Sequence, residues 1–78
     1  MKNVKIKERK NKMRHFLFCE RISGEQFIVG EEFFGDACDV AEGIAREIGF
    51  DYNNGEFELM FLYEMDEEEA EASGLDEY

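Results

Sequence analysis

The clearest pattern of apolar positions in the chain predicts one amphipathic helix from Ala37 to Ile48. Its apolar residues recur at spacings of three and one, which places them on one stripe of a helix. Asp36 stands before this stripe as a predicted N-cap, and Asp39 follows three residues later, as in a capping box. Gly49 follows the last apolar residue and predicts the end of the helix. The stripe consists of Ala37, Val40, Ala41, Ile44, Ala45 and Ile48.

Strand-forming residues gather in two runs before this helix and in one run after it. The runs Met13–Ile22 and Gln26–Val29 are joined by residues 22–25, which are typical of a short hairpin connection. After the helix, turn-forming residues precede Glu56–Glu64, whose length and composition predict a third strand. Further upstream, residues 4–7 alternate apolar side chains with lysines, which is compatible with an edge strand or an extension of the first strand.

These elements predict an α+β fold with the order strand, strand, helix, strand (ββαβ). A small antiparallel sheet of three or four strands would carry the helix on one face. The side chains expected beneath the helix are Phe16, Phe18, Phe27, Val29, Phe57, Leu59, Phe61 and Tyr63. Those expected on the opposite face are Leu17, Cys19, Ile28, Met60 and Leu62.

That opposite face is more apolar than a solvated face of an antiparallel sheet normally is, so it predicts a covered surface. Two kinds of cover remain open. Either a terminal segment of the same chain lies on it, or a partner or second copy does.

Charge divides this single-domain chain of 78 residues into three regions. Residues 1–12 form a basic N-terminal arm, residues 13–65 the ββαβ domain, and residues 66–78 an acidic C-terminal tail or short helix. In the tail, Asp66 is a predicted helix cap and Gly74 a predicted helix end. The net charge is −11, yet residues 15–78 hold two arginines against 19 acidic residues.

No residue pattern in the chain predicts catalysis, a metal site or a cofactor. His15 is the only histidine, and Cys19 lies four residues along the same strand, too far for a hydrogen bond in a regular strand. Together with Cys38 these residues lack the spacing of a zinc site. Residues 51–58 do not keep the spacing of an EF-hand calcium loop. We therefore predict a protein that is not an enzyme.

Cysteine usage and hydropathy predict the compartment. Two cysteines are too few for a disulfide scaffold, so free thiols in a reducing cytosol are expected. No apolar run approaches the length of a membrane span, and no secretion signal is evident. The sequence therefore predicts a cytoplasmic protein without a membrane partner.

The acidity of residues 15–78 indicates a basic partner. Such a body repels nucleic acid and attracts basic surfaces, and its self-repulsion disfavours the compact state, which suggests that the charge has a use. The alternative is that the acids only confer solubility. In size, acidity and expected fold the chain resembles small acidic proteins of phages and plasmids, of which the DNA-mimicking anti-CRISPR inhibitors are the best known. The resemblance is of overall character and carries no site residue.

The resemblance implies a non-enzymatic inhibitor that occupies a basic nucleic-acid-binding cleft of a host effector. The basic arm departs from this type. The residues predicted to bind the partner are Glu56, Glu58, Met60, Leu62, Glu64, Asp66, Glu67, Glu68, Glu69 and Glu71. A second hypothesis is a homodimeric structural or accessory protein that associates through the open sheet face. A third, direct nucleic-acid binding through residues 2–14, is disfavoured by the acidic body.

Overall fold

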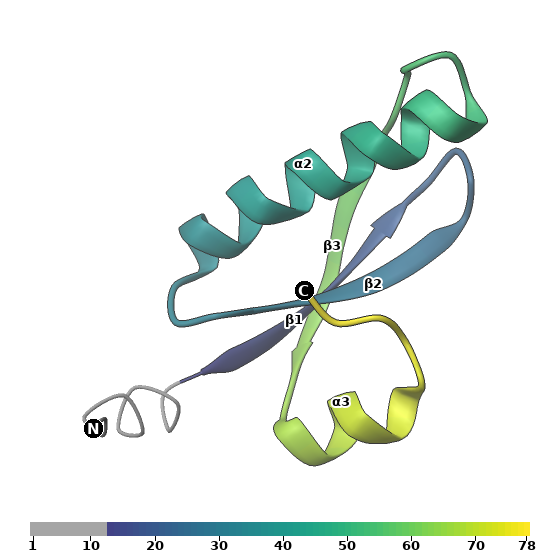
Figure 1. The fold of residues 1–78 in the computed structure, drawn as a ribbon. Coiled ribbons are helices and arrows are strands. Elements are labelled where there is room, and N and C mark those ends of the chain that lie inside the picture. Colours follow the sequence, from purple (N-terminus) through teal and green to yellow (C-terminus); the bar gives the residue numbers. More distant parts are fainter. Residues whose placement is uncertain (1–12) are drawn as a thin grey trace, which may run out of the picture.

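The computed structural model describes residues 13–78, which form a three-stranded antiparallel sheet flanked by two helices (Figure 1). The elements are β1 (Arg14–Glu20), β2 (Glu25–Glu31), α2 (Phe34–Tyr52), β3 (Leu59–Met65) and α3 (Glu67–Ser73). The predicted α+β class is confirmed, and the predicted ββαβ order is extended by α3 to ββαβα. The predictions for the basic arm and for a strand at residues 4–7 lie outside the described residues.

Strand β1 lies in the centre of the sheet, whose strand order is β2-β1-β3. The hairpin predicted between β1 and β2 is present, and its turn contains Gly24 with a positive φ of 81°. The three central residues of β1, Phe16, Leu17 and Phe18, are all buried although their side chains alternate between the two faces. Both faces of the sheet are therefore covered.

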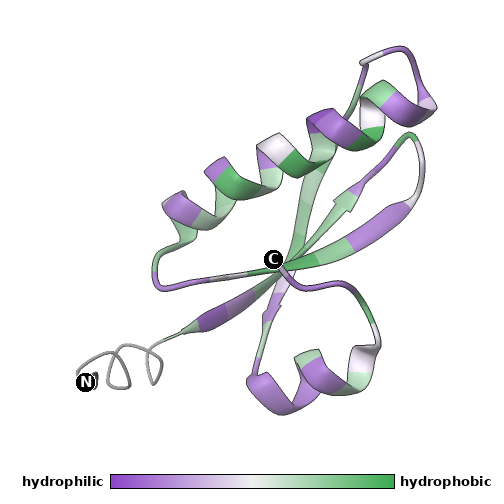
Figure 2. Ribbon diagram, viewed as in Figure 1, coloured by the Kyte–Doolittle hydropathy of each residue, from purple (hydrophilic) through white to green (hydrophobic). Residues whose placement is uncertain are grey.

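The first face is covered by α2, as predicted. Phe16, Phe18, Phe27 and Val29 are buried there against the small residues Ala37 and Ala41 of the helix, and Leu59 packs at the margin. Figure 2 shows hydrophobic and hydrophilic residues alternating along α2, as expected of a helix with one buried stripe. The alanines let the helix lie close to the large phenylalanine rings of the strands.

Helix α2 begins earlier than predicted, and Asp36 is not its N-cap. Phe33 occupies the cap position without a side-chain hydrogen bond, and Asp36 lies in the first turn, where an acid still suits the helix dipole. The ring of Phe34 lies 5.3 Å from that of Phe16 and 4.9 Å from that of Phe61, measured between centroids. We attribute the earlier start to this packing, which stabilises an additional helical turn.

Gly49 does not end α2 but lies inside it. The chain returning to β3 passes directly against this position, which leaves no room for a side chain. A Cβ atom at Gly49 would lie 2.5 Å from the carbonyl oxygen of Glu56. That oxygen belongs to backbone, so it has little room to move. The helix instead ends at Tyr52, and the N–H groups of Asn53 and Gly55 both donate to the carbonyl of Gly49. The predicted turn is confirmed, with positive φ at Asn54 and Gly55.

The second face is covered in part by the acidic tail of the same chain, which is one of the two kinds of cover that the sequence left open. Helix α3 places Ala70 against Leu17, Ile28 and Met65, and Leu75 packs at the margin of this second cluster. The predicted helix cap and stop in the tail are both present. Asp66 accepts a hydrogen bond from the N–H of Glu69 at 2.8 Å, and Gly74 adopts a left-handed conformation.

Residues 76–78 close the outer edge of β2. The N–H of Ile28 donates to the carbonyl of Asp76, the N–H of Tyr78 donates to the carbonyl of Ile28, and the N–H of Gly30 donates to the carbonyl of Tyr78. Glu77 and Ile28 form a parallel bridge. The tail is thus held by backbone pairing as well as by apolar contact.

A β-bulge in β3 changes which side chains face α2. Phe18 pairs with Phe61, but Leu17 pairs with Tyr63, so Leu62 is an extra residue in the register. Tyr63 therefore shares a face with Leu17 of the second cluster, and the prediction that it packs beneath α2 is wrong. Strand β3 also runs from Leu59 to Met65 rather than over the predicted 56–64, because Glu58 still belongs to the loop from α2.

The close passage at Gly49 predicts a strong asymmetry between two glycines of the same helix. Gly49→Ala should lower the free energy of unfolding by about 2 kcal/mol or more, because its Cβ displaces the backbone of Glu56. Gly43→Ala should raise it by about 0.5–1 kcal/mol, because nothing lies within 4 Å of the added Cβ and alanine favours helix. Urea unfolding measures both, and equal effects of the two substitutions would contradict the described path of the loop.

Candidate functional site

The residues predicted to bind a partner do not form one continuous row. Glu56 and Glu58 precede β3, whereas Met60 pairs with Cys19 within it. Beyond the bulge, Glu64 pairs with Phe16 and therefore lies on the α2 face, opposite to the face of Met60. The regular alternation that would have placed these acids side by side is thus interrupted at Leu62.

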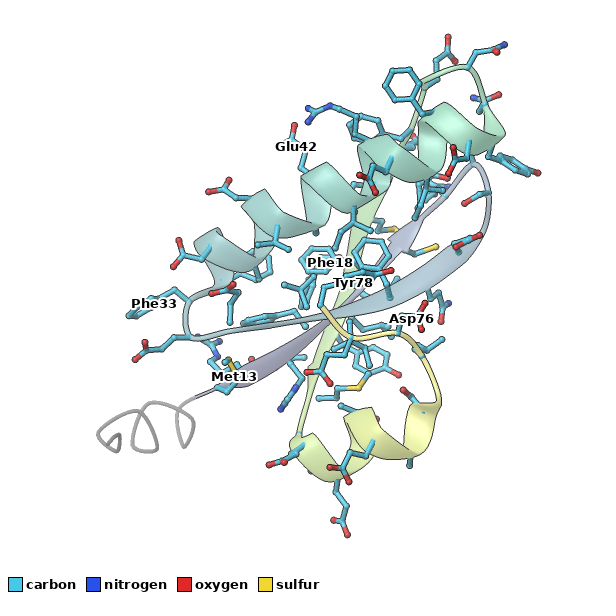
Figure 3. All side chains as sticks on the ribbon, viewed as in Figure 1. Met13, Phe18, Phe33, Glu42, Asp76 and Tyr78 are labelled. Carbon is cyan, nitrogen blue, oxygen red and sulfur yellow. The ribbon has the colours of Figure 1, made fainter. Side chains whose placement is uncertain are left out.

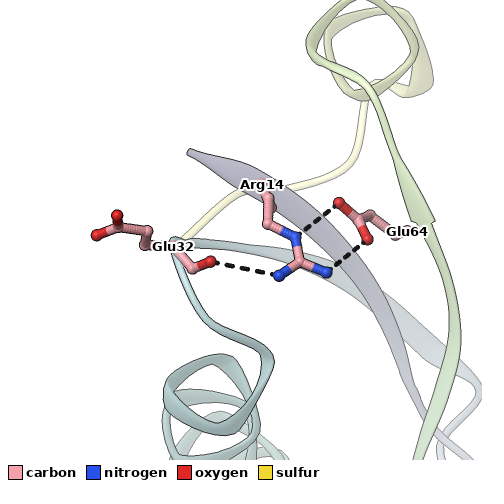
Figure 4. A network of polar contacts seen from close by, with 3 residues as sticks. All are labelled: Arg14, Glu32 and Glu64. Atoms are coloured by element: carbon pink, nitrogen blue, oxygen red, sulfur yellow. Dashed lines mark hydrogen bonds and ion pairs between the residues drawn. The ribbon is translucent and has the colours of Figure 1, made fainter. Parts of the chain in front are cut away.

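Glu64 is held by an arginine rather than left available to a partner. Arg14 donates from Nε and Nη2 to the two carboxylate oxygens of Glu64, at 2.9 and 3.0 Å, and from Nη1 to the carbonyl of Glu32 (Figure 4). These hydrogen bonds lower the pKa of Glu64. The pair is exposed, so it contributes little to stability. Its local effect is to offset the negative charge at this end of β3.

The two apolar residues of the predicted site differ in exposure. Met60 is 39% exposed, whereas Leu62 is half-buried and packs onto the second cluster. Leu62 therefore contributes to the fold, and Met60 presents an apolar surface at the edge of the sheet. Phe61, which was expected beneath the helix, and Phe34 are also partly exposed, and their rings pack edge to face on the α2 side.

Helix α3 holds the densest group of acids on an ordered element. Glu67, Glu68, Glu69 and Glu71 are all exposed, and no arginine or histidine among residues 13–78 forms an ion pair with them. The cap at Asp66 and the buried Ala70 fix the helix on the sheet. We name these four residues, together with Asp66, the α3 acidic cluster.

A second group of acids lies on the outer surface of α2, across the sheet from α3. Its exposed members are Asp36, Asp39, Glu42, Glu47 and Asp51. Glu42, which points away from the sheet in Figure 3, lies 3.5 Å from Arg46 in an i, i+4 ion pair. The negative charge of the described residues is therefore ordered, but it occupies two sides of the molecule rather than one.

Glu20 is a buried carboxylate whose role the sequence did not reveal. It accepts hydrogen bonds from the N–H groups of Ser23 and Glu58, both at 2.7 Å, and from that of Ile22 at 3.2 Å. Burial by itself raises the pKa of a carboxyl, but these hydrogen bonds outweigh it and lower the pKa of Glu20 to about 2. The carboxylate thus joins the hairpin turn to the loop that leads into β3.

His15 contacts the C-terminal residues of the chain. Its Nδ1 lies 2.6 Å from a carboxylate oxygen of Glu77, which crosses over Gly30 to reach it. A Cβ at Gly30 would lie 3.0 Å from that oxygen, so glycine leaves room for the contact. The interaction fastens residues 76–78 beside β2.

The remaining reactive groups form no site among residues 13–78. Cys19 and Cys38 are free, and burial, with a smaller effect from Asp39, raises the pKa of the Cys38 thiol. No three metal-binding side chains come together in this part of the chain. None of its helices is long and apolar enough to cross a membrane.

The chain matches no protein-family model, no curated protein and no solved structure. Residue roles therefore rest on the geometry of this chain alone.

The hydrogen bonds of Glu20 predict a pH-dependent contribution to stability. Glu20→Gln replaces the carboxylate with an amide, whose NH2 group would face backbone N–H donors that the carboxylate now accepts from. We therefore expect the substitution to lower the free energy of unfolding by about 3 kcal/mol at pH 7. The folded pKa lies below the ordinary value of 4.5, so the contribution is complete above that value and is lost as pH falls toward 2. The difference between the two proteins should therefore shrink over this range.

Denaturant unfolding at a series of pH values measures that difference. Glu25→Gln is the matched control, because Glu25 pairs with Glu20 across the hairpin but is exposed. A constant difference between wild type and Glu20→Gln down to pH 2 would show that folding does not lower the pKa of Glu20.

Proposed function

We propose that this protein is a non-enzymatic binding protein that occupies a basic, nucleic-acid-binding surface of another protein. The α3 acidic cluster is the part of the molecule that makes the contact. The partner would be an effector whose lysines and arginines normally contact phosphate groups, so the complex would inhibit its binding of nucleic acid.

The observation that carries the proposal is the arrangement of the α3 acidic cluster. Four adjacent or nearly adjacent glutamates lie exposed on a capped helix that packs on the sheet, without a basic partner among residues 13–78. Residues on a helix advance by about 1.5 Å each, and duplex DNA carries one charge per about 1.7 Å of its axis. The cluster therefore offers a basic cleft a charge density of the kind that it accepts from DNA.

The fold also supports recognition over plain solubility. The helix cap, the backbone pairing to β2 and the apolar contacts with the sheet hold the glutamates of the tail in fixed positions. Because the acids are held before the partner arrives, binding loses little conformational entropy. Charge of this kind accelerates association and makes binding sensitive to salt.

Neutralising the cluster tests the proposal without reversing the charge at the start of α3. The protein is immobilised, exposed to a cell lysate and then eluted with duplex DNA, and the eluted proteins are identified by mass spectrometry. The triple variant Glu67→Gln, Glu68→Gln and Glu69→Gln should capture far fewer nucleic-acid-binding proteins than the wild type. Elution by DNA selects proteins held through their nucleic-acid-binding surfaces. Nuclease treatment beforehand excludes bridging by nucleic acid.

The matched control removes the same number of charges from the other acidic surface. Asp39→Asn, Glu47→Gln and Asp51→Asn lie on the outer side of α2 and should leave capture unchanged. Equal losses for the two triple variants would indicate a general effect of net charge and would refute a role specific to α3. Capture that duplex DNA does not reverse would refute a nucleic-acid-binding surface as the target.

A further inference from the structure

The two outer edges of the sheet differ in their backbone pairing. The edge of β2 is paired with residues 76–78 through three backbone hydrogen bonds. Within residues 13–78, no segment pairs with the outer edge of β3, which is a full strand of seven residues. An open edge presents unpaired N–H and C=O groups to any extended chain that approaches it.

Large apolar side chains remain exposed on both faces of this edge. Met60 is 39% exposed on the α3 side, and Phe61 is 39% exposed on the α2 side, where it stacks against the partly exposed Phe34. Tyr63 is 49% exposed beyond the bulge. A strand that paired with β3 would have apolar surface to contact on each face, as strand addition requires.

The acids around the edge select the chemistry of the added strand. Glu58 lies exposed at the start of β3, and the α3 acidic cluster follows its end. Arg14 offsets the charge of Glu64, and Arg21 lies 3.9 Å from Glu58, so the α3 acidic cluster supplies most of the negative charge beside the edge. Two copies would repel each other, because residues 15–78 hold two arginines against 19 acidic residues. The edge therefore disfavours a second copy and favours a strand that carries lysine or arginine.

We propose that the open edge of β3 binds an extended, lysine- or arginine-rich segment of the partner protein by strand addition. The backbone of the segment pairs with β3, and its apolar side chains contact Met60 or the Phe34–Phe61 pair. Its basic side chains reach Glu58 and the α3 acidic cluster. This inference rests on the proposed function, to which it adds the mode of contact.

A synthetic peptide that alternates lysine with valine is the probe for the full-length chain. Binding is measured by titration, and backbone hydrogen exchange at residues 59–65 is followed by NMR. The peptide should bind and slow exchange of β3 amides that do not pair with β1. A peptide of the same sequence with alternate backbone nitrogens methylated should bind much more weakly, because it lacks the donors for pairing while keeping every charge.

Two single substitutions locate the edge. Cys19 of β1 pairs with Met60 on one side and with Gln26 on the other, so these two residues lie at the same level and on the same face. Met60→Lys should weaken binding of the basic peptide by about fivefold or more through charge repulsion at the edge. Gln26→Lys adds the same charge at the closed edge and should have a much smaller effect.

Several outcomes would overturn the inference and leave the proposed function standing. If the methylated peptide bound equally well and β3 exchange did not change, the contact would be electrostatic only. If the β3 amides were already protected without peptide, the edge would be occupied by this chain's residues 1–12 or by a second copy, and dilution would separate these cases. The proposed function is judged separately, by the capture that duplex DNA reverses.

Discussion

A three-stranded sheet with two apolar faces and one long helix is the constraint on which this structure depends. Strand β1 directs Phe16 and Phe18 to one face and Leu17 to the other, and α2 can bury only the first. Leaving Leu17 and Ile28 in water would forgo about 1.5–3 kcal/mol for each side chain. The chain meets this requirement with its most acidic segment, which offers Ala70 and Leu75 inward and glutamates outward. The C-terminal segment that buries the second face of the sheet is therefore also the segment that carries the exposed acids.

The bulge at Leu62 links the core to the surface of β3. By adding one residue, it moves Tyr63 to the face of the second cluster and brings Glu64 to the α2 face, where Arg14 binds it. The same change separates Glu64 from Glu58, so the acids of β3 and the α3 acidic cluster do not form one row. Packing thus decides which carboxylates remain available for recognition.

The sequence predicted the features that follow from local patterns. The hairpin at Gly24 and the helix cap at Asp66 appear where turn chemistry and spacing placed them, and so does the α2 stripe except for Val40, which is exposed. It failed where contacts distant in sequence decide the outcome. Phe34 joins the helix because rings from two strands meet it, and residue 49 is a glycine within the helix because residue 56 leaves no room there for a side chain.

The site was predictable to a similar degree. The acids of α3 could be located from the run of glutamates after Asp66, because a capped helix keeps neighbouring residues ordered. Their separation from the acids of β3 could not, because a one-residue bulge leaves no signal in an alternating sequence. Glu20 was equally hidden, since its donors come from two loops that only the folded chain brings together.

Glu20 couples two connections that lie at the same end of the sheet. Connecting loops commonly tolerate inserted residues because their backbone is solvated and unconstrained. Here the carboxylate of Glu20 accepts hydrogen bonds both from the turn at residues 22–23 and from Glu58 at the entry to β3. The positions of these two connections, which are remote along the polypeptide, are therefore coupled. Lengthening either of them would pull on the other. Permissive positions for grafting a label or a foreign loop are therefore better sought outside these two connections.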